Sequence, residues 1–253
     1  MSVHYIEFVP NQFTFVGDGA VVYEGPTQTA AAGSDFDRAI IWEEAVNSGA
    51  DQPFLEIPID RLPPGTYQYL RASVTYQNAN VRFNIINLPA PLPSSLIDQT
   101  GTLAGFIGFN TYIQQHQVFS RSLTVNADKI QGFWAFEPQL DAPYQDLYLQ
   151  WVNTNGIESG QAPPGSTTVV NPLEAFGVEL PQGSCIVTGQ LAEPLIITGQ
   201  ETEDLKVTLS FSVNNSFEWV DLNNNGAWDL DASGANLERP VDMGLRGLRV
   251  IVE

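Results

Sequence analysis

The sequence predicts an all-β fold, an antiparallel β-sandwich of about a dozen strands with one short helix and long loops. Composition is the first reason: of 253 residues only 15% are charged, while 21 are glycine and 17 are proline, which favours a turn-rich protein over a helical bundle. The second reason is the period-two alternation at residues 205–213, where odd positions are apolar and even positions are polar or cationic. A half-buried strand of an antiparallel sheet has this pattern.

The other strands are predicted from shorter β-prone runs bounded by glycine, proline or other turn residues. In chain order, and including the run already named, the predicted strands are residues 5–9, 13–23, 54–59, 66–76, 81–86, 105–112, 122–125, 130–136, 147–152, 185–188, 195–198, 205–213 and 248–252. Many short strands separated by turn signals are typical of a β-sandwich.

The predicted helix covers residues 35–46. Ser34 is a suitable N-cap, Asp37 places an acidic residue in the first turn, and Gly49 follows the end. The apolar residues that would share one face of this helix are Phe36, Ala39, Ile40 and Val46. Such a helix would pack against a sheet edge or link two strands.

A single β-sandwich-like domain is expected over residues 1–253. The proline-rich residues 88–93 and the polar residues 154–168 are the best loop candidates. Neither segment is long enough to require a domain boundary, and the alternative is a split near residues 155–170.

The chain is strongly acidic. Asp and Glu number 29 against 10 Lys and Arg, which gives a formal net charge of −19 and a pI of about 4.1. Phosphate backbones and anionic membrane surfaces would be repelled, so nucleic acid is not expected as a partner. The excess of carboxylates fits either a well-hydrated, soluble surface or a surface that binds divalent cations.

Zinc sites are not expected, because Cys185 is the single cysteine and His4 and His116 are the only histidines. Any metal would need oxygen ligands. Cys185 lies in a strand-like context and is interpreted as a structural thiol.

No stretch has the length of about 20 apolar residues that spans a bilayer, and the chain does not open with an export leader. The absence of a leader does not establish a cytoplasmic location, since an export signal removed from the sequence would leave the same start.

One segment, residues 221–231, has the spacing of a calcium loop. Oxygen-bearing side chains stand at loop positions 1, 3, 5, 9 and 11, and glycine stands at position 6. Calcium takes six to eight oxygen ligands, and alternate residues of a tightly curled loop aim their side chains inward. The predicted ligands are the side chains of Asp221, Asn223, Asn225 and Asp229 and the backbone carbonyl of Ala227.

The twelfth position of this loop is Ala232, where an EF-type loop has a bidentate glutamate. Asp231 stands one residue earlier and Glu238 six residues later, and either would complete the ligand set by a different path. The alternative to a calcium site is an ion-free hairpin, in which Asn225-Gly226 forms the turn and the Asx side chains bond their own backbone.

Three other groups of carboxylates are close together in the sequence, and they keep a carboxylate-dependent hydrolase open as an alternative. A glycosidase needs two carboxylates at a defined separation in space, which neighbours in sequence do not demonstrate, so solvated surface is the preferred interpretation. The groups are Asp35 with Asp37, Glu43 with Glu44, and Glu201 with Glu203 and Asp204.

Aromatic residues suggest a glycan-binding module as another alternative. Flat aromatic faces beside amides and carboxylates suit sugar rings, although a β-sandwich core also uses aromatics. The aromatic residues in question are Tyr67, Tyr69, Tyr76, Phe133, Trp134, Phe136, Tyr144, Tyr148 and Trp151.

Residues 62–71, 188–204, 215–221 and 241–248 resemble segments of uncharacterised exported lipoproteins of Bacteroidetes-type bacteria. The resemblance implies a signal peptide and a lipid-anchored cysteine upstream of Met1. It also implies a longer insert after the acidic loop, which would make Glu238 a better closing ligand than Asp231.

These observations together predict a non-catalytic, exported or cell-surface β-sandwich protein with a calcium-stabilised acidic loop and a binding or assembly role. Its location would be extracellular, periplasmic or at the outer-membrane surface. The expected partners are a calcium ion and either a glycan or another surface protein.

Overall fold

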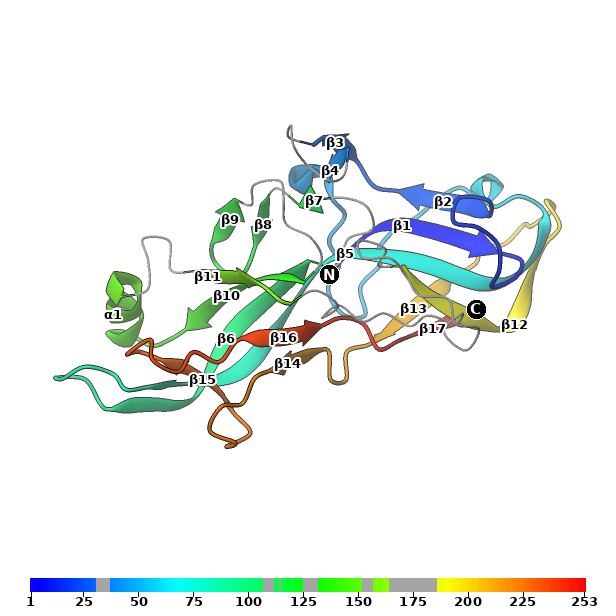
Figure 1. The fold of residues 1–253 in the computed structure, drawn as a ribbon. Helices are drawn as coiled ribbons and strands as arrows, with labels where there is room; N and C mark the ends of the chain where they lie inside the picture. The colour runs from blue at the N-terminus through cyan, green and yellow to red at the C-terminus, as the bar shows by residue number, and fades with distance from the viewer. Residues whose placement is uncertain (31–36, 107–111, 114, 125–131, 152–156, 164–185) are drawn as a thin grey trace.

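The structure is a computed structural model that describes residues 1–30, 37–106, 112–113, 115–124, 132–151, 157–163 and 186–253. These residues form seventeen strands, one α-helix and two short 3-10 helices (Figure 1). The strands are β1 (Ser2–Val9), β2 (Ala20–Glu24), β3 (Thr27–Thr29), β4 (Arg38–Ile40), β5 (Gly65–Ile86), β6 (Ser95–Phe106), β7 (Tyr112–Ile113), β8 (Gln115–Gln117), β9 (Ser122–Thr124), β10 (Phe133–Gln139), β11 (Glu158–Gln161), β12 (Val187–Ile197), β13 (Val207–Ser212), β14 (Phe217–Trp219), β15 (Trp228–Asp231), β16 (Pro240–Met243) and β17 (Gly247–Val252). The all-β fold is confirmed.

Ten of these strands form the largest sheet. Its main path runs β11-β10-β6-β5-β12-β17-β13, and β1, β2 and β15 attach beside that path. Most neighbours are antiparallel, but β12 with β17 and β15 with β5 are parallel, as is the small pair β4 with β7. The sheet is therefore mixed. Long stretches of chain separate the parallel partners, so no hairpin constrains their direction.

The central element is β5, which is 22 residues long and pairs with four other strands. Its first half lies between β1 and β12, and its second half lies between β6 and β15 (Figure 1). The sequence predicted two strands here, residues 66–76 and 81–86, with residues 77–80 between them. The strand continues through them because β6 supplies backbone partners along the whole segment.

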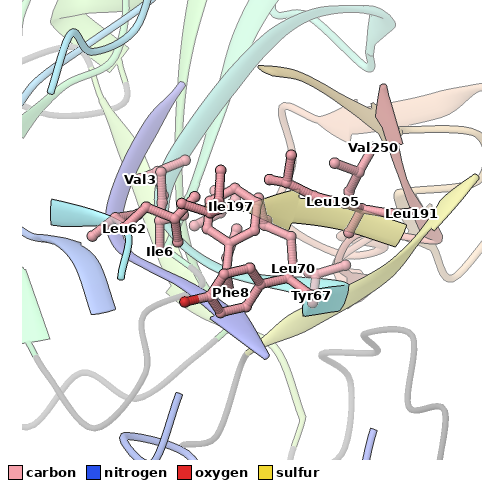
Figure 2. Close-up of a cluster of buried hydrophobic side chains, with 14 of the residues drawn as sticks. Val3, Ile6, Phe8, Leu62, Tyr67, Leu70, Leu191, Leu195, Ile197 and Val250 are labelled. Carbon is pink, nitrogen blue, oxygen red and sulfur yellow. The ribbon is translucent and has the colours of Figure 1, made fainter. Parts of the chain in front are cut away.

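Two apolar clusters pack against the two halves of β5. The first contains Val3, Ile6 and Phe8 of β1, Leu70 of β5, and the side chains of β12 and β17 that Figure 2 shows around them. The second centres on Trp228 and Phe83, which are both 1% exposed, and on the completely buried Phe136. The edge-to-face contact of Phe136 with Trp228, with centroids 4.7 Å apart, anchors the start of β15 in this second cluster.

The helix predicted at residues 35–46 is wrong for the part that the structure describes. Residues 38–40 form β4, paired with β3 and β7, and a 3-10 turn (Trp42–Glu44) follows. Ala39 and Ile40 are buried by this pairing, which outweighs the capping signals at the start of the predicted helix. Residues 31–36 lie outside the described residues.

The α-helix occurs instead at α1 (Tyr144–Trp151), where a strand was predicted at residues 147–152. Asp146 lies in its first turn and Pro143 precedes it, an arrangement that favours a helix start. Tyr148 points inward and donates to Glu158 Oε1 of β11 (2.8 Å). Residues 54–59 do not form the predicted strand and lead into a second 3-10 turn (Ile59–Arg61).

The C-terminal strand β17 lies inside the sheet, between β12 and β13. Strands on both sides of the alternative boundary near residues 155–170 belong to the same sheet, since β5 pairs with β1 and also with β12 and β15. None of the helices in the described ranges is long and apolar enough to cross a membrane.

Candidate metal centre

The predicted calcium loop connects β14 to β15, and β15 fixes its C-terminal half. Trp228 and Leu230 alternate into the apolar core, so Asp229 and Asp231 point to the other face of the strand. The parallel register of β15 on β5 places Asp229 beside Asn84. The position of Asp229 is therefore set by the sheet rather than by the loop alone.

The loop is curled by hydrogen bonds from its own backbone. The two carboxylate oxygens of Asp221 accept from the N–H groups of Asn225 (3.1 Å) and Gly226 (2.8 Å). Asn223 Oδ1 accepts from the N–H of Asn225 (3.1 Å), and Asn225 Oδ1 accepts from that of Ala227 (2.7 Å). Gly226 has a positive φ of 75°, which glycine adopts without strain. The side chains at positions 1, 3 and 5 are thus gathered on the inner side of one turn.

Asp229 lies at the centre of this arrangement and is only 1% exposed. Its Oδ1 accepts from Asn84 Nδ2 (2.7 Å), and its Oδ2 accepts from Asn225 Nδ2 (2.9 Å) and from Asn223 Nδ2. The orientation of the Asn84 amide follows from its second bond, in which Asn84 Oδ1 accepts from the N–H of Asp98 (2.8 Å). A buried carboxylate is therefore surrounded by neutral amide donors.

Glu238, also buried at 4% exposure, holds the two ends of the loop together. Its Oε1 accepts from the N–H of Leu222 (2.9 Å), and its Oε2 accepts from the N–H of Asp229 (2.8 Å). The backbone carbonyl of Glu238 accepts from Trp228 Nε1 (3.1 Å). Of the two residues considered for closing the loop, Glu238 is the one in contact with it.

Asp231 belongs to a separate turn. Its oxygens accept from Asn87 Nδ2 (3.0 Å), from the N–H and hydroxyl groups of Ser233 (2.8 and 2.7 Å) and from the N–H of Asn236 (3.1 Å). Burial by itself would raise the pKa of Asp231, but these donors outweigh it and lower the pKa to about 2. Asp231 therefore caps residues 233–236 and makes none of its hydrogen bonds with the loop.

The carboxylates of the loop form no ion pair with the basic residues that the structure describes. Of the ion pairs found within the described ranges, none involves Asp221, Asp229 or Glu238. No group of three or more His, Cys, Asp or Glu side chains in this part of the chain has the geometry of a metal site. The oxygen atoms gathered here are instead a mixture of carboxylate, amide and carbonyl groups, including the Ala227 carbonyl, which accepts from Trp219 Nε1 (3.2 Å).

The other residues that the sequence singled out are buried or half-buried, exposed, or outside the described residues. Trp134 and Tyr148 are buried and Tyr144 is half-buried, so these three do not form an exposed sugar platform. The side chains of Trp151 and His116, together with Asp35 and Cys185, lie outside the described residues. The carboxylates of Glu43, Glu44, Glu203 and Asp204 are exposed, as expected for solvated surface.

Sequence reasoning missed Asn84 and Trp219, the two side chains that connect the loop to the neighbouring strands. The alternating pattern of β5 predicts that the polar Asn84 faces solvent. It is instead buried, at 7% exposure. Its partner Asp229 is 145 residues away in the chain. Only the three-dimensional register brings them together.

Comparison with known proteins found no matching family model, no similar curated protein and no similar solved structure.

Proposed function

We propose that the loop at residues 221–229, closed by Glu238, binds one calcium ion. The buried Asp229 carries this proposal, because its carboxylate is removed from water and, among the residues that the structure describes, accepts hydrogen bonds only from side-chain amides. A buried carboxylate is stable when it is paired with a cation or ligates a metal. A hard cation beside Asp229 would supply the missing positive charge.

The donor set fits calcium better than other metals. Asp221, Asp229 and Glu238 offer carboxylate oxygens, Asn223 and Asn225 offer amide oxygens, and the Ala227 carbonyl has a second lone pair beside its bond to Trp219. These are hard oxygen ligands, which calcium accepts and zinc does not prefer. The side-chain amides of Asn223 and Asn225 would have to pivot, so that oxygen rather than N–H faces the ion.

The ion would act on stability rather than in a reaction. Asp229 is bonded to Asn84 of β5, and Glu238 precedes β16, so an ion at the loop would fasten β14, β15 and β16 to the central strand. Calcium sites of extracellular modules typically have dissociation constants of about 10⁻⁴ to 10⁻³ M. We propose accordingly a non-catalytic, exported or cell-surface protein with a binding or assembly role, anchored by a lipid if its likeness to exported lipoproteins extends to the N-terminus.

Thermal unfolding tests the ion site. The wild-type protein is melted in calcium and in EGTA, beside Asp229→Asn and Asp231→Asn, which change two equally buried aspartates of the same strand. Calcium at ten times its dissociation constant stabilises the folded state by about 1.4 kcal/mol, and each kcal/mol raises the Tm of a chain of this size by about 2–4 °C.

The calcium-dependent rise in Tm is expected for the wild type and for Asp231→Asn and is expected to vanish for Asp229→Asn. Equal Tm values in calcium and EGTA for the wild type would contradict the ion site. A rise that survives in Asp229→Asn would place the ion elsewhere.

A further inference from the structure

The strand pairing along one edge of β5 is interrupted. β1 pairs with β5 as far as Tyr76, and β15 pairs with it from Phe83 onward. β6 also pairs with Tyr76 and with Phe83, and at both residues it occupies the other edge of β5. β1 and β15 therefore lie along the same edge of β5. The six residues 77–82 separate the two neighbours.

Along these six residues, no strand in the described part of the chain pairs with β5 on the side away from β6. None of their backbone groups takes part in the additional backbone hydrogen bonds found among the described residues. Asn78, Ala79, Asn80 and Arg82 are exposed. An open strand edge of this kind is a template for another chain, since every second N–H and C=O group points outward without a partner.

A cavity of about 420 Å³ opens at one end of the gap. Its walls combine apolar side chains of β5, β14 and β15 with a polar side formed by Arg82, Asn84 and Asp98. The apolar side chains are Val81, Phe83, Phe217, Trp219 and Trp228. The rings of Phe217 and Trp219 are stacked, with centroids 5.6 Å apart and planes at 26°. A strand added along the gap would run past this cavity, which has the size and lining to accept one large apolar side chain.

We propose that the gap binds an extended polypeptide segment of about six residues as an added strand, with an apolar side chain in the cavity. Six residues in strand conformation span roughly 20 Å. A single extended chain fits between β1 and β15, whereas the β5 edge of a second copy is flanked by the same two strands and is blocked by them. The net charge of −19 favours a segment with basic ends.

This inference rests on the binding role proposed above and gives it a partner class. The strand pairing does not need the ion, because the gap is formed by the pairing of β1, β5 and β15. The cavity borders the ion loop at Gly226 and Ala227, so calcium is expected to change the affinity for the peptide without abolishing binding. Peptide binding is therefore expected in EGTA as well as in calcium. If the peptide binds but calcium leaves the Tm unchanged, only the ion site is contradicted. If calcium raises the Tm but the peptide does not bind, only the strand site is contradicted.

The test uses a blocked six-residue peptide with lysine at each end and, between them, threonine, valine, threonine and tryptophan in that order. It is titrated into the ¹⁵N-labelled protein and followed by NMR. Chemical-shift changes are expected at residues 77–82 and at the indole N–H of Trp219, and the outward-facing amides of the gap should exchange with solvent at least about tenfold more slowly.

The control peptide has the same sequence with every backbone nitrogen between the lysines methylated, so that it cannot pair with a strand edge. Its affinity is expected to be lower by about tenfold or more, because each 1.4 kcal/mol of lost hydrogen bonding is a factor of ten. Equal affinity of the two peptides, shifts confined to other parts of the protein, or no shift at millimolar peptide would each overturn the proposal.

Discussion

Two of this protein's loops are held by buried carboxylates, and only the first of the two has an arginine partner among the described residues. At the loop after β1, Glu7 of β1 is completely buried and its Oε1 accepts from the N–H groups of Gly17 (3.0 Å) and Gly19 (2.7 Å). Its Oε2 lies 3.4 Å from Arg71 Nη1. Arg71 also donates to the backbone carbonyls of Gln12 and Thr14, so a single ion pair fastens the whole loop to β5.

The loop after β14 uses its carboxylates in the same way but contains no arginine. Glu238 accepts two backbone N–H groups, as Glu7 does, and Asp229 is buried beside it. A third example supports the rule, because Glu137 accepts from the N–H groups of Phe119 and Ser120 and lies 3.7 Å from Arg121 Nε. Among the described residues, Glu7 and Glu137 are thus buried beside an arginine and Glu238 is not, which is why we propose that the third site takes its cation from solution.

Removing the internal cation should have the largest effect. Arg71→Met leaves the Glu7 carboxylate buried without a partner, which is expected to lower the free energy of unfolding by about 3–5 kcal/mol. Urea denaturation measures this change, and calcium should not restore the loss. The double variant Glu7→Gln with Arg71→Met is expected to recover part of it. A loss below about 1 kcal/mol would show that the Glu7 loop does not depend on its ion pair.

Removing the glutamate of the other loop should have a smaller effect that depends on calcium. Glu238→Ala leaves the N–H groups of Leu222 and Asp229 without acceptors and is expected to cost about 2–4 kcal/mol in EGTA. Glu238→Gln keeps one acceptor oxygen and should cost about half as much. In calcium, both variants should show a larger loss than in EGTA, measured by the same urea titration. An identical loss in both buffers would show that Glu238 does not contribute to calcium binding.

Acid should remove the stabilisation that the hydrogen bonds of Asp231 provide. The pKa of Asp231 is about 2 in the folded protein against 3.8 for an ordinary aspartate. Since the folded pKa is the lower one, the stabilisation is fully present above about pH 4 and is lost as the pH falls toward 2. Chemical denaturation across this window should show a loss on the order of 1–2 kcal/mol that Asp231→Asn lacks. If Asp231→Asn loses the same stability as the pH falls, the titrating group is not Asp231.

The smallest effect is expected at a partly exposed ion pair near the end of the chain. Arg246 Nη2 lies 3.0 Å from Asp242 and 4.0 Å from Glu218, and its side chain is 21% exposed. Arg246→Ala should therefore cost about 1 kcal/mol or less, and added salt should reduce the difference. A cost equal to that of Arg71→Met would show that burial does not explain the contrast between these pairs.

The parts of the fold that the sequence predicted are those set by local pattern. The alternation at residues 205–213 becomes β13, and the spacing at residues 221–231 becomes a curled loop in which Asp221, Asn223 and Asn225 share one turn. The partners that complete the loop were not predictable from spacing. Asn84 meets Asp229 through the register of two strands that lie far apart in the chain.

The same limit explains the errors. Residues 38–40 carry local helix signals and become a strand because they pair with β3 and β7, and Ala39 and Ile40 are buried there. The choice between Asp231 and Glu238 depended on the path of the chain after β15, which spacing alone does not determine. Glu7 and Arg71 are 64 residues apart, so their pairing left no signal in the sequence.

Calorimetric titration of calcium tests whether the loop closed by Glu238 takes its cation from solution. We expect one ion to bind to the wild-type protein and to Asp231→Asn, and none to bind to Asp229→Asn. No binding heat at millimolar calcium, or the same binding isotherm for Asp229→Asn as for the wild type, would contradict it.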